Sequence, residues 1–430
     1  MIRVLFFTAV TATLLPYIYN RTEYRLLSYI IAVAAIIGVT SMLWLDRRMR
    51  SLVIQIAHRS SHFLLYCALI LVSQSVSTLL IPELGVFDYV WALGYIFGGL
   101  IAYFVFPTVI WNGMFKKLLG FLIFVGAFSS AIAVYVAFTG AKEVLGFHIR
   151  QVQPYVPLGI YATSSIFYNA NRFGPVAFFG LLGSLYFIWE RRYILVVVPT
   201  LFLCAAGVVV SWNRGIYLGF ALAFSVWLVI ITKPSHRYTS IGLLTLLTIT
   251  GVFTVAHVRP LNAALLELGL AKREILWPAM IQLIMERPLA GYGFGRAEII
   301  ESRVYSYTGS ASAAHSAPLS IAFHGGIPLA LLYLMIFWIS LRRLQRSKLG
   351  RPEKATVMAG MTGLFVAALF SDYTPGGVAY ATFLYTIFLG LANASPWLSS
   401  MRGARVRILT ERGRANGNRK PTIGFVPNYN

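Results

Sequence analysis

Long apolar blocks, separated by short polar segments, repeat along almost the whole chain. An α-helix needs roughly 20 apolar residues to cross the ~30 Å hydrocarbon core of a bilayer. The pattern therefore predicts an all-α, polytopic membrane protein with about twelve transmembrane helices. The predicted spans are residues 2–19, 26–45, 62–81, 87–111, 118–139, 173–189, 193–211, 215–232, 239–257, 317–341, 355–371 and 378–397.

The composition agrees with this class. Of the 430 residues, 58% are hydrophobic and 12% are charged, whereas soluble domains carry roughly a quarter charged residues. Cys67 and Cys204 both lie inside apolar blocks, which excludes a disulfide framework and a cysteine-based metal site. The stretch after Arg3 resembles a signal peptide, but no small-residue cleavage site and soluble domain follow it, so we expect it to be the first span.

The formal net charge of +22 is informative through its distribution. Basic residues concentrate in alternate connections and in the C-terminal tail, which is typical of topological anchoring and of contact with anionic membrane lipids. We therefore expect no nucleic acid as a partner. Because Lys and Arg favour the cytoplasmic side, both termini are predicted to be cytoplasmic. The basic connections are residues 47–59, 116–117, 191–192, 233–237 and 342–354.

Two connections on the opposite, outer side are long. The predicted organisation is residues 1–257 with nine helices and an outer loop near 140–172, a large outer loop at 258–316 that carries helices, residues 317–397 with three helices, and a basic cytoplasmic tail at 398–430. Within the tail, residues 401–430 are rich in Arg, Gly, Asn and Pro, which predicts disorder. Long ordered loops tend to hold functional residues, so we expect the chemistry at the outer surface.

The segment Ser211-Trp212-Asn213-Arg214-Gly215 interrupts an apolar stretch and marks a tight outer turn. One interpretation is structural: Asn and Gly allow the turn, and Arg214 reaches the lipid headgroups. The other is functional, because an arginine held at a cavity in the membrane can bind an anion.

A helical pattern in the large outer loop begins at Lys272-Arg273 and continues to Arg287. Arg273 and Arg287 are fourteen residues apart and would share one face of a straight helix, although Pro278 can kink it. The same helix could instead lie on the membrane surface with its cations on headgroups. Alternating glycines follow at residues 291, 293 and 295; they end the helix and allow a close backbone approach, and without a following Gly-Lys-Ser/Thr they are not a P-loop.

His315 lies at the outer mouth of the tenth predicted span, and His324 lies deeper, where packing is the simpler role. A lone histidine is usually structural, but a neutral imidazole beside several fixed cations can accept a proton. The outer loops hold few carboxylates, and the chain has no His-Glu-x-x-His motif or Cys/His cluster. We therefore expect no metal ion and no cofactor, so that any phosphate must be bound by Arg and Lys.

In this order, these residues resemble the bacterial O-antigen ligase family. The resemblance is carried by Ser211-x-x-Arg214-Gly215, by Pro288-Leu289-x-Gly291-x-Gly293-x-Gly295, and by His315-Ser316-x-x-Leu319 with Gly325-Gly326-Ile327. Where the family usually has His-Asn, this chain has His-Ser. The motifs cover residues 211–327, and the remaining spans agree with the family in number and topology only.

The resemblance implies a glycosyltransferase of the bacterial inner membrane with its active site facing the periplasm. Its donor would be a glycan on undecaprenyl diphosphate, and its acceptor a sugar of lipid A-core. It implies a metal-independent, inverting transfer in which His315 accepts the proton of the acceptor hydroxyl. Arg214, Arg273 and Arg287 would hold the diphosphate, with Lys272 and Arg172 as further candidates.

Two relatives within the same superfamily remain open, an O-antigen polymerase and a protein O-oligosaccharyltransferase. They would differ from a ligase in the acceptor. A transporter of lipid-linked sugars is a different class, and it would need charges within the spans or discontinuous helices at the midplane. The apolar blocks contain few charges, which favours an enzyme acting at the surface.

Overall fold

The computed structural model describes residues 2–14, 18, 22–86, 88–149, 152–155, 159–167, 169–232, 273–294, 315–376 and 379–415. It is mostly helical, and the described part contains 5 helical stretches long and apolar enough to cross a membrane. These findings agree with an all-α, multi-pass membrane protein. The predicted span at 239–257 and most of the predicted outer loop at 258–316 lie outside the described residues.

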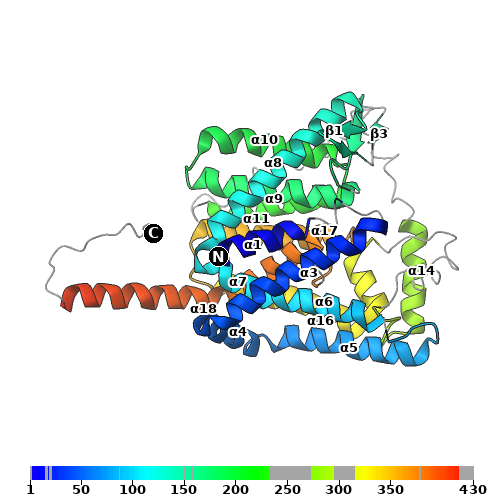
Figure 1. Ribbon diagram of the computed structural model, residues 1–430, viewed down its shortest axis with the longest axis horizontal. Coiled ribbons are helices and arrows are strands. Elements are labelled where there is room, and N and C mark those ends of the chain that lie inside the picture. The colour runs from blue at the N-terminus through cyan, green and yellow to red at the C-terminus, as the bar shows by residue number, and fades with distance from the viewer. Residues whose placement is uncertain are drawn as a thin grey trace.

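Most helices lie side by side along one direction (Figure 1). They are α1 (Ile2–Ala12), α3 (Thr22–Leu45), α5 (Ser61–Leu80), α6 (Asp88–Leu100), α8 (Phe115–Thr139), α9 (Ala170–Trp189), α10 (Ile194–Val210), α11 (Arg214–Ile231), α16 (Ala317–Arg346), α17 (Arg351–Ala368) and α18 (Tyr380–Ala415). Between α6 and α8 the chain passes through the π-helical turns η1 (Ile101–Val105) and η2 (Ile110–Met114), with α7 (Phe106–Val109) between them.

Small residues allow the closest helix contacts. A Cβ atom placed on Gly126 of α8 would lie 2.7 Å from the Cα atom of Gly180 on α9. On Gly219 of α11 it would lie 2.3 Å from the carbonyl oxygen of Gly363 on α17. Membrane helices pack through such small residues because lipid offers no hydrophobic drive for their association.

The predicted connection at residues 47–59 is largely a helix, α4 (Arg47–His58). Its Met49, Val53 and Ile56 are buried at helical spacing, while Arg47 is exposed. The sequence did not predict this amphipathic helix, because its cations interrupt the run of apolar residues by which a span is found.

The outer connection at residues 140–172 was predicted only as a long loop, and it folds into two antiparallel hairpins. Strand β1 (Glu143–Val144) pairs with β2 (Phe147–His148), and β3 (Val152–Tyr155) pairs with β4 (Ile160–Thr163). Ile149 is buried against Ile132 and Val136 of α8, which seats the hairpins on the bundle.

The prediction of disorder from residue 401 was wrong as far as Ala415, because α18 continues as a helix to that residue. Residues 416–430 lie outside the described part of the chain.

The helix predicted in the large outer loop is present as α14 (Arg273–Glu286). Figure 1 shows it lying across the direction of α5 and α16, at the end of the bundle where α5 stops. Its buried face carries Leu276, Met280, Leu283 and Ile284, which pack with Ile81, Leu84, Tyr292 and Phe323. Burial of these apolar side chains favours the position of α14 against the end of the bundle, although Ile281 and Met285 of the same helix are exposed.

Helix α16 is long and apolar enough to cross a membrane, as predicted for residues 317–341, but it is kinked. A straight helix of 30 residues would measure about 45 Å, longer than the ~30 Å hydrocarbon core. The helix breaks at Gly326, where φ is 79° and ψ is 171°. Residues 317–325 therefore form a separate arm before the break, a feature that the span predicted over 317–341 did not include.

Candidate functional site

The break in α16 is hydrogen-bonded to the glycine segment, residues 287–294, which follows α14. Pro328 has no N–H, so the carbonyl oxygen of His324 loses its helical donor four residues on. That oxygen instead accepts hydrogen bonds from the amide of Gly293 at 2.8 Å and from the Ser73 hydroxyl of α5 at 2.8 Å. The amide of Ile327 donates to the carbonyl of Pro288 at 2.7 Å. The segment thus replaces part of the hydrogen bonding that α16 loses at its break.

Glycine is required in this segment by space as well as by conformation. Gly291 and Gly293 have φ angles of 66° and 83°. A Cβ atom on Gly291 would lie 2.5 Å from the carbonyl oxygen of Phe323, and on Gly293 it would lie 2.9 Å from the Cβ of Ser77. The close backbone approach predicted from the glycines is therefore present.

The amides of this segment have protein partners. Tyr292 donates to the Phe323 carbonyl at 2.9 Å, Gly293 to the His324 carbonyl, and Phe294 to the Gln74 side chain at 2.6 Å. These N–H groups are therefore engaged in folding and are not presented to a phosphate. The role of the glycines is to join α5, α14 and α16; Gly295 lies outside the described residues.

The connection between α17 and α18, residues 369–376, gathers several of the candidate residues. The Nδ1 atom of His315 lies 3.7 Å from Oδ2 of Asp372. The guanidinium of Arg273 donates to the carbonyl oxygen of Phe370 at 3.0 Å, and its carbon lies 5.8 Å from the centre of the Phe370 ring. His315 and Arg273, forty-two residues apart in sequence, therefore meet at one short loop.

Arg214 and Arg172 lie in the first turns of helices that reach the same loop. Asn213 caps α11 by accepting the amide of Ile216 at 3.1 Å, and its side-chain amide donates to the hydroxyl of Tyr373 at 3.4 Å. The Tyr373 hydroxyl donates in turn to the carbonyl of Asn171, at the start of α9. Since Arg214 follows Asn213 and Arg172 follows Asn171, both cations lie on helix ends tied to Tyr373.

The structure does not group Arg287 with these residues. It follows α14 and lies about 21 Å from Arg273 along the helix axis. Its guanidinium carbon is 5.1 Å from the centre of the Tyr292 ring, and the Tyr292 hydroxyl donates to Glu286 at 2.8 Å. Arg287 thus belongs to the glycine segment. Lys272 lies outside the described residues.

His315 adopts a left-handed backbone conformation, with φ at 47°. This conformation is uncommon for a residue with a side chain, although histidine adopts it more often than most. Its neighbour Ser316 begins α16, and the backbone of Ser316 hydrogen-bonds Asp372. The start of α16 is therefore held by the same carboxylate that faces the imidazole.

The charges of the site are coupled. Burial raises the pKa of the Asp372 carboxyl, while His315, Ser316 and Arg273 act in the opposite direction. Partial burial lowers the pKa of Arg273, and Asp372 opposes that shift. His315 and Arg273 therefore favour the negatively charged form of Asp372, which burial disfavours.

Sequence reasoning missed Asp372, Phe370 and Tyr373. A signal was available for Asp372, since it is a lone carboxylate between two apolar blocks on the predicted outer side. His324 agrees with its predicted packing role: its Nδ1 atom is 2.7 Å from the carbonyl oxygen of Gly293, and its ring stacks on Phe294.

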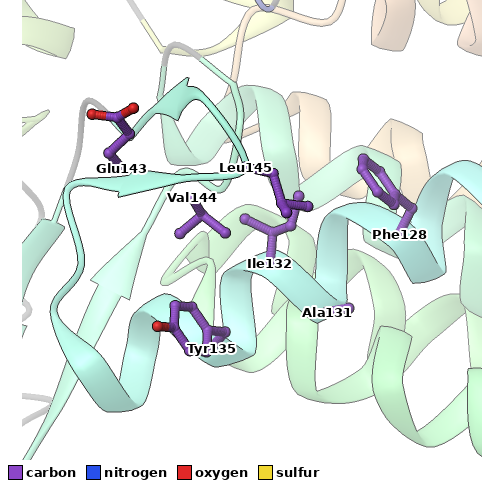
Figure 2. A pocket seen from close by; sticks show the side chains of 7 residues that line it. All are labelled: Phe128, Ala131, Ile132, Tyr135, Glu143, Val144 and Leu145. Atoms are coloured by element: carbon purple, nitrogen blue, oxygen red, sulfur yellow. The ribbon is translucent and has the colours of Figure 1, made fainter.

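A separate hollow lies away from these residues, between α8 and the β1–β2 hairpin. Figure 2 shows Leu145 of the hairpin reaching toward Phe128 and Ile132 of α8. Its lining is apolar apart from Glu143 and Tyr135 and includes none of the candidate residues, so we assign it no transfer chemistry. Among the described residues, no group of three His, Cys, Asp or Glu side chains could hold a metal ion.

Comparison with protein families matches residues 199–334 to the O-antigen ligase family. The matched segment contains Arg214, Arg273, Arg287 and His315, and it ends after the break in α16. No curated protein and no solved structure matches the chain.

Proposed function

We propose that this chain, whose residues 199–334 match the O-antigen ligase family, transfers a glycan from undecaprenyl diphosphate to lipid A-core. The reaction takes place at the periplasmic face of the bacterial inner membrane. Both substrates carry hydrocarbon tails, so the site must be reached from the bilayer.

One observation carries the proposal: His315, Arg273 and the helix ends bearing Arg214 and Arg172 converge on residues 370–373. Transfer needs a proton acceptor for one substrate and cations for the other, and these residues supply both at one end of the bundle. Surface anchoring alone does not explain why Arg273 bonds the carbonyl of Phe370, in the connection between α17 and α18, rather than extending toward headgroups.

In the proposed step, the hydroxyl oxygen of the acceptor attacks the anomeric carbon of the donor. The bond from that carbon to the diphosphate oxygen breaks as the new glycosidic bond forms, so the anomeric centre inverts. His315 accepts the hydroxyl proton. Its Nδ1 atom faces Asp372, which leaves Nε2 for the acceptor, and Asp372 orients the ring and stabilises the imidazolium that forms.

The leaving diphosphate gains negative charge as the bond breaks. Arg273 and Arg214 hold it, because the planar guanidinium fork matches pairs of phosphate oxygens. Arg172 and Lys272 add to this positive field. Arg287, about 21 Å along the helix from Arg273, engages the donor through a part more distant from the reacting carbon.

The test is transfer by the purified protein in detergent or nanodiscs, without any ion gradient, from a glycan linked to undecaprenyl diphosphate. The expected product is lipid A-core bearing the glycan. Extension of a second donor glycan instead would identify a polymerase, and transfer to a peptide hydroxyl would identify a protein O-oligosaccharyltransferase. Gradient-dependent movement of the donor without product would identify a transporter and overturn the proposal.

A further inference from the structure

At the end of the bundle opposite His315, Arg343 of α16 reaches into a polar junction between helices. Its guanidinium donates to the hydroxyl of Ser60 at 3.3 Å, to the side-chain oxygen of Asn393, and to the carbonyl of Arg59 at 2.8 Å. Asn393 also donates to Ser60 at 2.6 Å. All of these acceptors are neutral, so the charge of this half-buried arginine is hydrogen-bonded but not neutralised.

A second cation lies beside it. The guanidinium carbons of Arg343 and Arg59 lie 4.8 Å and 5.6 Å from the centre of the Trp397 ring. Two like charges therefore share one aromatic ring. The ion pairs of the described residues join Lys116 and Arg192 to Glu190, and His315 to Asp372; none involves Arg59 or Arg343.

Like charges held together without a carboxylate are unfavourable in a poorly hydrated environment. An anion from outside the protein that binds between the two guanidinium groups relieves this repulsion. This junction lies at one end of the bundle, where α5 begins, beside α4 and the point at which α18 leaves the bundle (Figure 1). Its position points to the phosphate of a lipid headgroup as the anion.

The surrounding surface has the features of a headgroup level. One turn before Arg343, Trp338 is exposed, and the guanidinium carbon of Arg342 lies 4.9 Å from the centre of its ring. Aromatic residues gather at the membrane interface, and basic residues follow them on the cytoplasmic side. The amphipathic α4, with its exposed Arg47, ends next to Arg59.

We propose that Arg59, Arg343 and Trp397 form a binding site for the headgroup phosphate of an anionic phospholipid in the leaflet opposite His315. Arg343 is fixed by Asn393 and Ser60, so its fork is preorganised. Arg59 is exposed and can close on the phosphate from the other side. Basic pockets between membrane helices recognise anionic headgroups in this way. Bound lipid would join the α4–α5 turn, α16 and α18.

The test is native mass spectrometry of the intact protein with phosphatidylglycerol, cardiolipin or phosphatidylcholine. We expect retention of the anionic lipids, and a rise in the apparent melting temperature with them that phosphatidylcholine does not produce. The double variant Arg59→Gln/Arg343→Gln should lose anionic-lipid affinity by about tenfold or more, since it removes both charge-assisted hydrogen-bond donors to the phosphate. If the double variant folds poorly, the single variant Arg59→Gln is measured instead, because Arg59 is exposed.

The matched control is Lys117→Gln/Arg351→Gln, which removes two exposed cations from the same end of the bundle. It should keep the wild-type affinity. Equal losses in both double variants would show a diffuse charge effect and overturn the site, as would unchanged binding in Arg59→Gln/Arg343→Gln. Stabilisation by inorganic phosphate alone, at the level of the lipid, would also overturn it in favour of a free-anion site. The measurement does not depend on glycan transfer.

Discussion

The imidazole Nδ1 atom of His315 lies 3.7 Å from the Oδ2 atom of Asp372, although the two residues are 57 positions apart in sequence. The pair joins the start of α16 to the connection between α17 and α18. The carboxylate faces the proposed base and places a counter-charge near the proton that the base gains. This relationship separates two roles that substitutions can test.

We expect His315→Ala to lower the transfer rate by about 10²–10⁴-fold, the usual contribution of a general base. The variant should insert into membranes and purify as the wild type does, and its donor affinity should be largely retained. Asp372→Asn should lower the rate less and leave donor affinity similar, because the proton acceptor remains. Transfer rates and donor titrations check both, and a loss of only a few-fold in His315→Ala would make the histidine structural.

Arg273→Lys should weaken donor binding by about 10–100-fold, since a charged hydrogen bond contributes about 1.5–3 kcal/mol and lysine lacks the planar fork. The rate with saturating donor should fall as well, because Arg273 also contacts the loop that holds Asp372. Arg287→Lys, just after the other end of α14, is the matched comparison. Its effect on the saturated rate should be smaller, and a reversed order would place the diphosphate at the glycine segment instead of at residues 370–373.

Activity of the purified protein should survive an excess of EDTA. The proposed step uses arginines to stabilise the diphosphate and histidine to take the proton, and it assigns no role to a divalent ion. The measurement is product formation with and without chelator in metal-depleted buffer. Loss of activity that Mg²⁺ restores would show that the guanidinium groups are not sufficient for the leaving group.

The positions of many helices follow from the sequence because hydrophobic length alone decides them. Helix α10 at Ile194–Val210 matches the predicted span 193–211, and α11 at Arg214–Ile231 matches 215–232. Helix α4 was missed because its apolar face is interrupted by cations, and the hairpins were missed because their strands are only two to four residues long.

The candidate site was predictable only in part. The motifs containing Arg214, Arg273 and His315 could be found, but their meeting point at residues 370–373 depends on tertiary pairing that local patterns do not encode. The break at Gly326 had a visible signal in Gly325-Gly326-Ile327-Pro328. The sequence does not show that the carbonyls freed there are taken up by residues 73 and 292–293, which come from another helix and another loop.

The orientation of the bundle can be tested by cysteine labelling. His148 in the β1–β2 hairpin and Arg191 between α9 and α10 are exposed, and the native Cys67 and Cys204 are buried, so background labelling should be low. A membrane-impermeant maleimide should modify His148→Cys from the periplasmic side, and Arg191→Cys only after the inner membrane is permeabilised. The opposite result would place His315 in the wrong compartment for the proposed reaction.

The joint between the glycine segment and α16 can be tested with two Gly→Ala substitutions that differ in one respect. Gly291 and Gly146 both have left-handed backbones, with φ at 66° and 77°. A Cβ atom at residue 146 would meet nothing within 4 Å, whereas at residue 291 it would lie 2.5 Å from the Phe323 carbonyl oxygen. Gly146→Ala therefore reports the conformational cost alone, about 1–2 kcal/mol.

Gly291→Ala should add an overpacking cost of about 1–3 kcal/mol and lower the apparent melting temperature further than Gly146→Ala does. It should also reduce transfer, since pushing the segment away from α16 displaces α14 and with it Arg273, whereas Gly146→Ala should leave transfer unchanged. The comparison uses thermal unfolding in detergent together with the transfer assay. Equal shifts in the two variants would mean that the segment does not lie against α16 in the membrane. A stability loss in Gly291→Ala with full activity would mean that α14 keeps its place without this joint.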